Sequence, residues 1–255
     1  MLLTSQEVMR YLGSFYWPFM RLTGVFLFAP IFGNSLLPVP FRVLFATMLA
    51  ACLAAWGGPW PALPANLVGI MLSGFIGISF GAMLGLVGQV VVAAVAGAGE
   101  MAGFALGINF ATLAGIATPG EVPVLAQIFQ WAGWLAYLGL GGPFWIMEAV
   151  ARSFHTLPAG IPALGALRSL FVYGGAILFD AVLLALPALA AALALNAMVS
   201  IANALATQLN IFSIGFPLLF LGGIWLVANA LFFIEPVAVS LMQQGTTVLS
   251  ALIHG

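Results

Sequence analysis

The sequence has very little charge. It contains no lysine, and its 255 residues carry only five arginines and six acidic side chains, which is 4% of the chain. Soluble globular proteins average about 25% charged residues. So few charges cannot cover the surface of a soluble domain of this length, and the composition excludes one. The net charge of -1 also excludes nucleic acid as a partner, because phosphate binding needs a basic patch.

Cysteine and histidine are scarce as well. Cys52 is alone, so it forms no internal disulfide, and the apolar residues around it predict a small buried side chain. Neither of the two histidines has a second metal ligand nearby in the sequence, and no nucleophile lies beside a base. The sequence therefore predicts no metal site, no cofactor, no catalytic residue and no enzymatic activity.

Apolar residues are abundant instead and make up 64% of the chain. They form six runs separated by links rich in proline and glycine, which predicts an all-α integral membrane protein with long, broken helices and helical hairpins. We interpret residues 1–255 as a single membrane domain. The runs cover residues 11–32, 41–56, 67–98, 124–147, 169–196 and 214–234.

The third run carries a small residue at every fourth position. We call these four residues, Ser73, Gly77, Gly81 and Gly85, the small-residue ladder. A spacing of four makes a slowly drifting stripe along one side of an α-helix. Such a stripe lets another backbone approach closely, which is how helices associate where water cannot drive them together. The ladder predicts close helix packing, and the alternative is an ordinary membrane helix rich in glycine.

Charged residues inside apolar runs are candidates for function. Arg21 lies in the first run, where it either faces a partner group or extends toward the membrane interface. Asp180 lies in the middle of the fifth run, with Pro187 seven residues later. An acid at that depth either serves a proton path, pairs within an assembly, or bonds to a broken helix. Glu148 and Arg152 have the spacing of a structural helical ion pair.

Two segments interrupt the hydrophobic pattern. Residues 106–120 combine glycines with large apolar side chains, which does not suit a loop that faces water. Irregular backbone at membrane depth must be enclosed by protein or line a cavity. We therefore interpret this segment as folded into an interior, with a re-entrant or interfacial helix as the alternative. The second interruption, residues 208–217, reads Gln-Leu-Asn-Ile-Phe-Ser-Ile-Gly-Phe-Pro.

Residues 208–217 resemble a signature of the FliR family, the R subunits of flagellar-type protein export gates. This family is similar to the matching subunits of virulence type III secretion systems. The motif residues are Gln208, Asn210, Phe212, Gly215 and Pro217. The resemblance continues through nearly the whole chain in the family's order, at Trp17-Pro18 with Arg21, Leu37-Pro38 with Arg42, Gly99-Glu100 and residues 153–158. The chain departs from the family at Ala204 and Thr207, where members usually have a basic residue and a proline.

The resemblance implies a non-enzymatic subunit, present once in a helical hetero-oligomer with several copies of the P and Q subunits. That assembly belongs to the flagellar basal body in the bacterial inner membrane. Its other implied partners are the B-type switch subunit, unfolded flagellar proteins in transit and membrane lipid. The resemblance also places a channel plug on residues 106–120, with Gly107, Phe110, Leu113 and Ile116 as the plug residues. Apolar side chains around a narrow pore would exclude water and ions.

A stand-alone transporter or channel for small solutes is the alternative function. Broken helices and an acid at mid-membrane depth are typical of transporters. Against it, the sequence has no internal repeat, and Asp180 has no counterpart in the other half of the chain. A transporter would purify as a monomer or homo-oligomer, whereas a gate subunit would purify with different partner chains.

Overall fold

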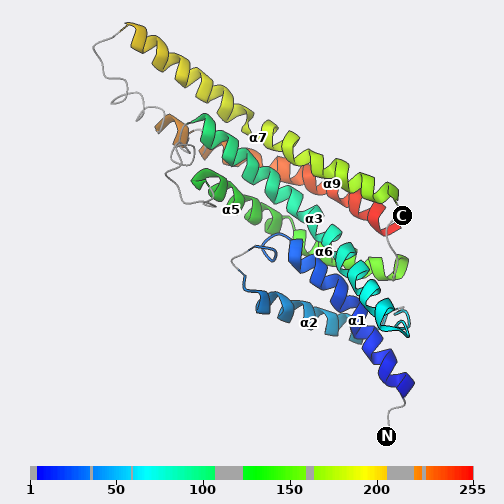
Figure 1. Cartoon of the computed structure of the whole chain (residues 1–255). Helices are drawn as coiled ribbons and strands as arrows, with labels where there is room; N and C mark the ends of the chain where they lie inside the picture. The colour runs from blue at the N-terminus through cyan, green and yellow to red at the C-terminus, as the bar shows by residue number, and fades with distance from the viewer. Residues whose placement is uncertain are drawn as a thin grey trace. The chain divides into compact units, whose positions relative to one another are not determined.

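The computed structural model describes residues 5–34, 37–58, 60–106, 123–158, 164–205, 221–225 and 228–254. Within these ranges the chain forms helices joined by turns and links, and no strand occurs (Figure 1). The predicted all-α class is therefore confirmed. Among the helices that the structure describes, four stretches are long and apolar enough to cross a membrane, namely Val39–Trp56, Leu67–Ala105, Gly165–Met198 and Leu221–Ile253. The last of them includes residues 226–227, which lie outside the described ranges.

The elements follow one another in a simple order. They are α1 (Ser5–Phe28), α2 (Val39–Trp56), α3 (Leu67–Ala105), α5 (Val124–Gly139), α6 (Gly142–Thr156), α7 (Leu164–Leu205), the short 3-10 helix η1 (Leu231–Phe233) and α9 (Ile234–His254).

Proline and glycine set several of these boundaries. Pro38 precedes α2, and Pro40 occupies its first turn, where a missing N–H costs nothing. Gly141 has a φ of 75°, a left-handed conformation that separates α5 from α6 and that a residue with a β-carbon rarely adopts. Pro236 lies in the first turn of α9, which directly follows η1, and a proline there lacks only an N–H that the first turn of a helix leaves unpaired.

Helix α3 is longer than the run predicted for residues 67–98, because it continues to Ala105. Glycines near its end lower the intrinsic helix propensity. Tertiary packing offsets that penalty: a β-carbon on Gly99 would lie 2.7 Å from the carbonyl oxygen of Leu125 and 2.7 Å from the β-carbon of Phe129. Close approach to α5 thus requires the residue that weakens the helix.

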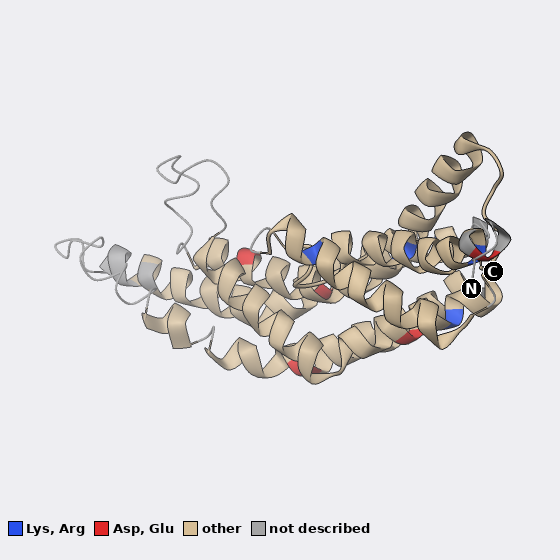
Figure 2. Cartoon of the chain, turned by 90° about the horizontal axis from the view of Figure 1, so that it is seen from below, with Lys and Arg blue, Asp and Glu red and all other residues tan. Residues whose placement is uncertain are grey.

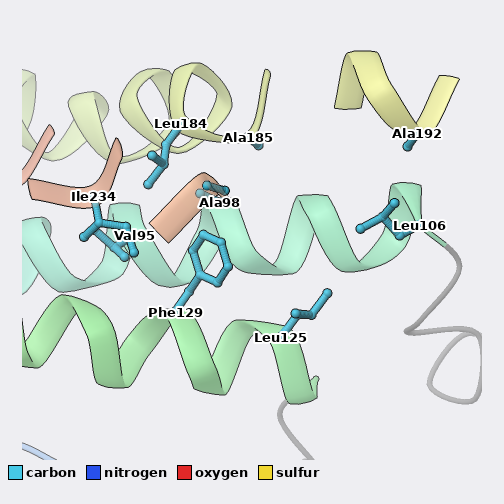
Figure 3. Packing of buried hydrophobic residues seen from close by; sticks show 10 residues of the cluster. Val95, Ala98, Leu106, Leu125, Phe129, Leu184, Ala185, Ala192 and Ile234 are labelled. Atoms are coloured by element: carbon cyan, nitrogen blue, oxygen red, sulfur yellow. The ribbon is translucent and has the colours of Figure 1, made fainter. Parts of the chain in front are cut away.

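The chain divides into two compact units. Unit 1 comprises Met1–Val90, Gly141–Gly174 and Met242–Gly255, and unit 2 comprises Val91–Leu140 and Gly175–Leu241. In unit 1, α1 packs against α2. In unit 2, parts of α3, α5, α7 and α9 share one buried apolar cluster, and Phe129 of α5 points toward Val95 and Ala98 of α3 (Figure 3).

Cys52 is exposed, so the expectation of a buried thiol was wrong. Helix α2 buries only Ala46 and Ala50. Successive residues turn by about 100° around a helix, so position 52 points well away from the side of Ala50. A uniformly apolar helix gives no sequence signal for which of its sides is covered.

Candidate functional site

The small-residue ladder lies against α1 in unit 1. A β-carbon on Gly81 would overlap the carbonyl oxygen of Arg21, and one on Gly85 would lie 2.8 Å from the carbonyl oxygen of Val25. Real β-carbons essentially never approach another heavy atom within 3.0 Å. At these two positions α3 therefore accepts glycine alone without movement of the backbone.

The first two ladder residues also face α1. The hydroxyl of Ser73 donates a hydrogen bond of 3.0 Å to the carbonyl oxygen of Ile70 and lies 3.2 Å from the hydroxyl of Tyr16. The Tyr16 hydroxyl also donates to the carbonyl oxygen of Ile70. A β-carbon on Gly77 would lie 3.1 Å from the β-carbon of Met20. The ladder thus changes from a polar contact at Ser73 to backbone contact at Gly81.

Sequence analysis missed the partner of the ladder on α1. A β-carbon on Gly24 would overlap the carbonyl oxygen of Ile78 and lie 2.7 Å from the backbone nitrogen of Ala82. Gly24 has no small residue four positions before or after it in α1, so no spacing could single it out. The sequence signal for Gly24 is indirect: where a stripe of small residues predicts close packing, a small residue is also expected on the facing helix.

Arg21 is buried beside this contact, with 2% of its surface exposed. Its Nη1 donates a 2.7 Å hydrogen bond to the hydroxyl of Ser153, and its Nη2 donates a 2.8 Å bond to the carbonyl oxygen of Leu157. The guanidinium carbon lies 4.7 Å from the ring centroid of Phe80 and 4.2 Å from that of Phe154. Arginine stays charged in proteins. Two uncharged hydrogen-bond acceptors and the faces of two aromatic rings stabilise the positive charge of Arg21.

An aromatic cluster surrounds the same arginine. The ring of Trp60 meets that of Phe154 at a centroid distance of 5.1 Å, and the indole N–H of Trp17 donates a 3.0 Å hydrogen bond to the carbonyl oxygen of Pro61. Among the described residues, Nε of Arg21 and Nε1 of Trp60 are buried without a hydrogen-bond partner. The cluster joins α1, the link after α2 and the end of α6 within unit 1.

The family resemblance of residues 153–158 did not reveal this contact. Ser153 lies 132 positions after Arg21 in the chain, and no periodicity connects the two. The usable signal is chemical, because a buried arginine needs hydrogen-bond acceptors. Ser153, in the last turn of α6, supplies one and lies in a segment with the same family resemblance. Arg21 therefore has partner groups inside its own unit.

Described residues on both sides of the predicted plug segment belong to one buried cluster in unit 2. Leu106 directly follows α3 and Leu125 lies in the first turn of α5, and both side chains belong to the cluster that contains Phe129 (Figure 3). The predicted plug residues Gly107, Phe110, Leu113 and Ile116, and the motif residues Gln208, Asn210, Phe212, Gly215 and Pro217, lie outside the described residues.

Asp180 lies in α7 within unit 2, with 7% of its surface exposed. The described residues give it no hydrogen bond and no ion pair. Its neighbour Ala181 faces α3, where a β-carbon on Gly97 would lie 3.3 Å from that of Ala181. Asp180 thus borders a tightly packed side of α7.

The other polar side chains that the structure describes have structural roles. The predicted pair of Glu148 and Arg152 is confirmed, with 2.5 Å between Oε1 and Nη2, and both side chains are exposed. No three histidine, cysteine or acidic side chains in the described part of the chain could hold a metal ion together. The candidate functional features of the described residues are the close contacts between helices and the buried cation of Arg21.

Comparison with known proteins gives the family of this chain. Residues 12–245 match the family described as bacterial export proteins, family 1. The chain is 32% identical to flagellar biosynthetic protein FliR of Escherichia coli K12, with 98% of this chain and 96% of that protein covered. It is 29% identical to FliR of Pectobacterium carotovorum, with 94% and 92% covered, and 26% identical to FliR of Aquifex aeolicus, with 84% and 83% covered. The chain therefore belongs to family 1 of the bacterial export proteins, as a non-enzymatic flagellar export protein of the FliR type with membrane helices.

Proposed function

We propose that the chain is the R subunit of a flagellar protein export gate in the inner membrane, within the basal body. With several copies of the P and Q subunits it forms the channel through which unfolded flagellar proteins leave the cytoplasm. The match to the family over residues 12–245 carries this proposal. The matched relatives are flagellar biosynthetic proteins, which supports an export role in building the flagellum over the transport of small solutes.

The exposed apolar surface of single helices supports an assembly. Only 11% of the residues of α2 are buried. On α7, Phe171 is 80% exposed, and Leu178 and Phe179 are each 69% exposed. Apolar patches this extensive mark contacts with lipid or with other proteins. In the proposed gate, P and Q subunits cover part of this surface and lipid covers the rest.

The predicted plug residues, Gly107, Phe110, Leu113 and Ile116, close the resting channel in this proposal. The support is the buried cluster that holds both Leu106 and Leu125. Because the flanking residues Leu106 and Leu125 are held in this cluster, a movement of the plug would not require α3 or α5 to move. Its apolar side chains would seal a narrow pore against ions and still yield to a passing chain.

The ladder and the family motif have structural roles in the proposed gate. Contact of Gly81 and Gly85 with α1 supports a rigid pair of helices onto which the P and Q subunits assemble. The amides of Gln208 and Asn210 satisfy backbone groups left free where the last hairpin is interrupted.

Purification in a mild detergent tests the proposal. The tagged chain should be recovered with P and Q subunits, each in more than one copy, and with the B-type switch subunit in cells that make it. An unrelated tagged membrane protein from the same host serves as the control and should recover none of them. A chain that purifies as a monomer or homo-oligomer, although the host makes P and Q subunits, would overturn the proposal.

A further inference from the structure

All cationic side chains of the protein belong to unit 1. The five arginines and both histidines fall within its three segments. Unit 2 contains only acids, namely Glu100, Glu121, Asp180 and Glu235. Figure 2 shows how few charges of either sign the described helices carry. Unit 2 therefore holds negative charge without any basic side chain of its own.

Asp180 is the acid for which this imbalance matters most. Glu235 is exposed, and Glu100 has an interaction partner. Asp180 has only 7% of its surface exposed and has neither a hydrogen bond nor an ion pair among the described residues. Its carboxylate oxygens are not among the fully buried side-chain atoms that lack a partner, so they reach the surface of the unit. A poorly hydrated carboxylate without a donor is unfavourable, so a group outside the described part of this unit pairs with it or the acid stays protonated.

A second acceptor lies one turn further along α7. Pro187 is inside this helix and has no N–H, so it cannot donate to the carbonyl oxygen of Leu183. Residues three, four and seven apart share one side of a helix, which places Asp180, Leu183 and Pro187 on one stripe. Leu183 is 48% exposed, so the stripe reaches the surface of the unit. The stripe offers a carboxylate and a backbone acceptor but no donor.

We propose that this stripe docks a transmembrane helix of another subunit that carries a lysine or arginine at mid-membrane depth. The cation donates to the carboxylate of Asp180 and, with a further N–H, to the carbonyl of Leu183. The apolar part of that helix lies against Phe179 and Leu186, which are 69% and 48% exposed on the same helix. An amide or hydroxyl could fill the hydrogen bonds but would leave the negative charge of unit 2 unbalanced.

This inference rests on the proposed function only in that the cationic helix belongs to a subunit of the same gate. Substitution of Asp180 tests it in the complex purified in mild detergent. Asp180→Leu should lower the recovery of partner chains by about tenfold or more, because it leaves the partner's cation buried without an acceptor. Asp180→Asn keeps a hydrogen bond but no charge and should cause a smaller loss. Glu235→Gln removes an exposed acid of the same unit and should leave recovery unchanged.

The outcomes separate the two proposals. Wild-type recovery with both Asp180 variants would overturn this inference and leave the proposed function intact. If Asp180→Asn assembles normally yet blocks export, the acid serves a proton path and the inference is likewise overturned. Failure of the unchanged chain to recover any partner would contradict the proposed function itself.

Photo-crosslinking avoids variants that fail to fold. A photoreactive amino acid at position 183 should crosslink to a membrane helix of another chain, and mass spectrometry would identify the segment. The matched site is Leu178, which is exposed on the other side of α7 and should give a different crosslink pattern. A crosslinked helix with a lysine or arginine at mid-membrane depth supports the inference. A helix without one, or crosslinks to lipid alone, overturns it.

Discussion

Gly81→Ala adds one methyl group where the backbones of α3 and α1 touch. The added carbon would overlap the carbonyl oxygen of Arg21 and lie 2.8 Å from the carbon of that carbonyl and 3.0 Å from the backbone nitrogen of Val25. These are backbone atoms, so no side-chain rotation can relieve the overlap. The two helices must separate or bend.

The expected magnitude follows from two opposing effects. Overpacking of this kind costs about 1–3 kcal/mol. Separation of the helices also weakens the contact at Gly85. In the opposite direction, alanine has a higher helix propensity than glycine, which stabilises the helix by up to about 1 kcal/mol. We expect a net loss of about 2 kcal/mol, which for a chain of this size lowers the melting temperature by about 4–8 °C. Gly81→Leu is much larger and should prevent recovery of the gate complex.

Thermal unfolding of the detergent-purified chain, followed by tryptophan fluorescence, measures this loss. Gly174→Ala is the matched control, because a β-carbon at Gly174 in α7 meets no other atom within 4 Å. The control should melt at or slightly above the wild-type temperature, by helix propensity alone. If Gly81→Ala melts as high as Gly174→Ala, α1 and α3 do not pack through their backbones and the ladder interpretation fails.

Four further variants test Arg21, Tyr173 and the predicted plug residue Phe110. Arg21→Met should destabilise the chain by about 2–4 kcal/mol in the same melt, since Ser153 and a backbone carbonyl lose a charged donor. Arg21→Lys should not restore it, because an ammonium lacks the planar fork that makes both bonds between two rings; wild-type melting of the lysine variant would contradict this. Tyr173→Phe removes a 3.2 Å hydrogen bond to the carbonyl oxygen of Val87 and should cost about 1 kcal/mol, and an unchanged melt would contradict its contribution. Phe110→Ala should make the resting membrane leaky to ions, and unchanged conductance would count against the plug.

Local features of the sequence were sufficient for the class of the helices and for some of their ends. The run predicted for residues 124–147 contains a Gly-Gly-Pro triplet at residues 141–143, and the structure divides the run there into α5 and α6, because such residues do not continue a helix without strain. The end of α3 was not visible, since packing against α5 keeps its last glycines helical. Pro187 lies inside α7 and does not end it, which a propensity argument would not give.

The sequence by itself determined that this is an all-helical membrane protein of a known export family, and it located the ladder. Those properties depend on composition and on spacing along the chain, which are local. Only the tertiary structure decided that Gly24 on α1 lies against α3 and that Ser153 and two aromatic rings stabilise the charge of Arg21. It also decided that Asp180 is buried with no hydrogen bond or ion pair to another described residue. These facts depend on distances between residues far apart in sequence, and a uniformly apolar chain gives no local signal for which of its helices meet.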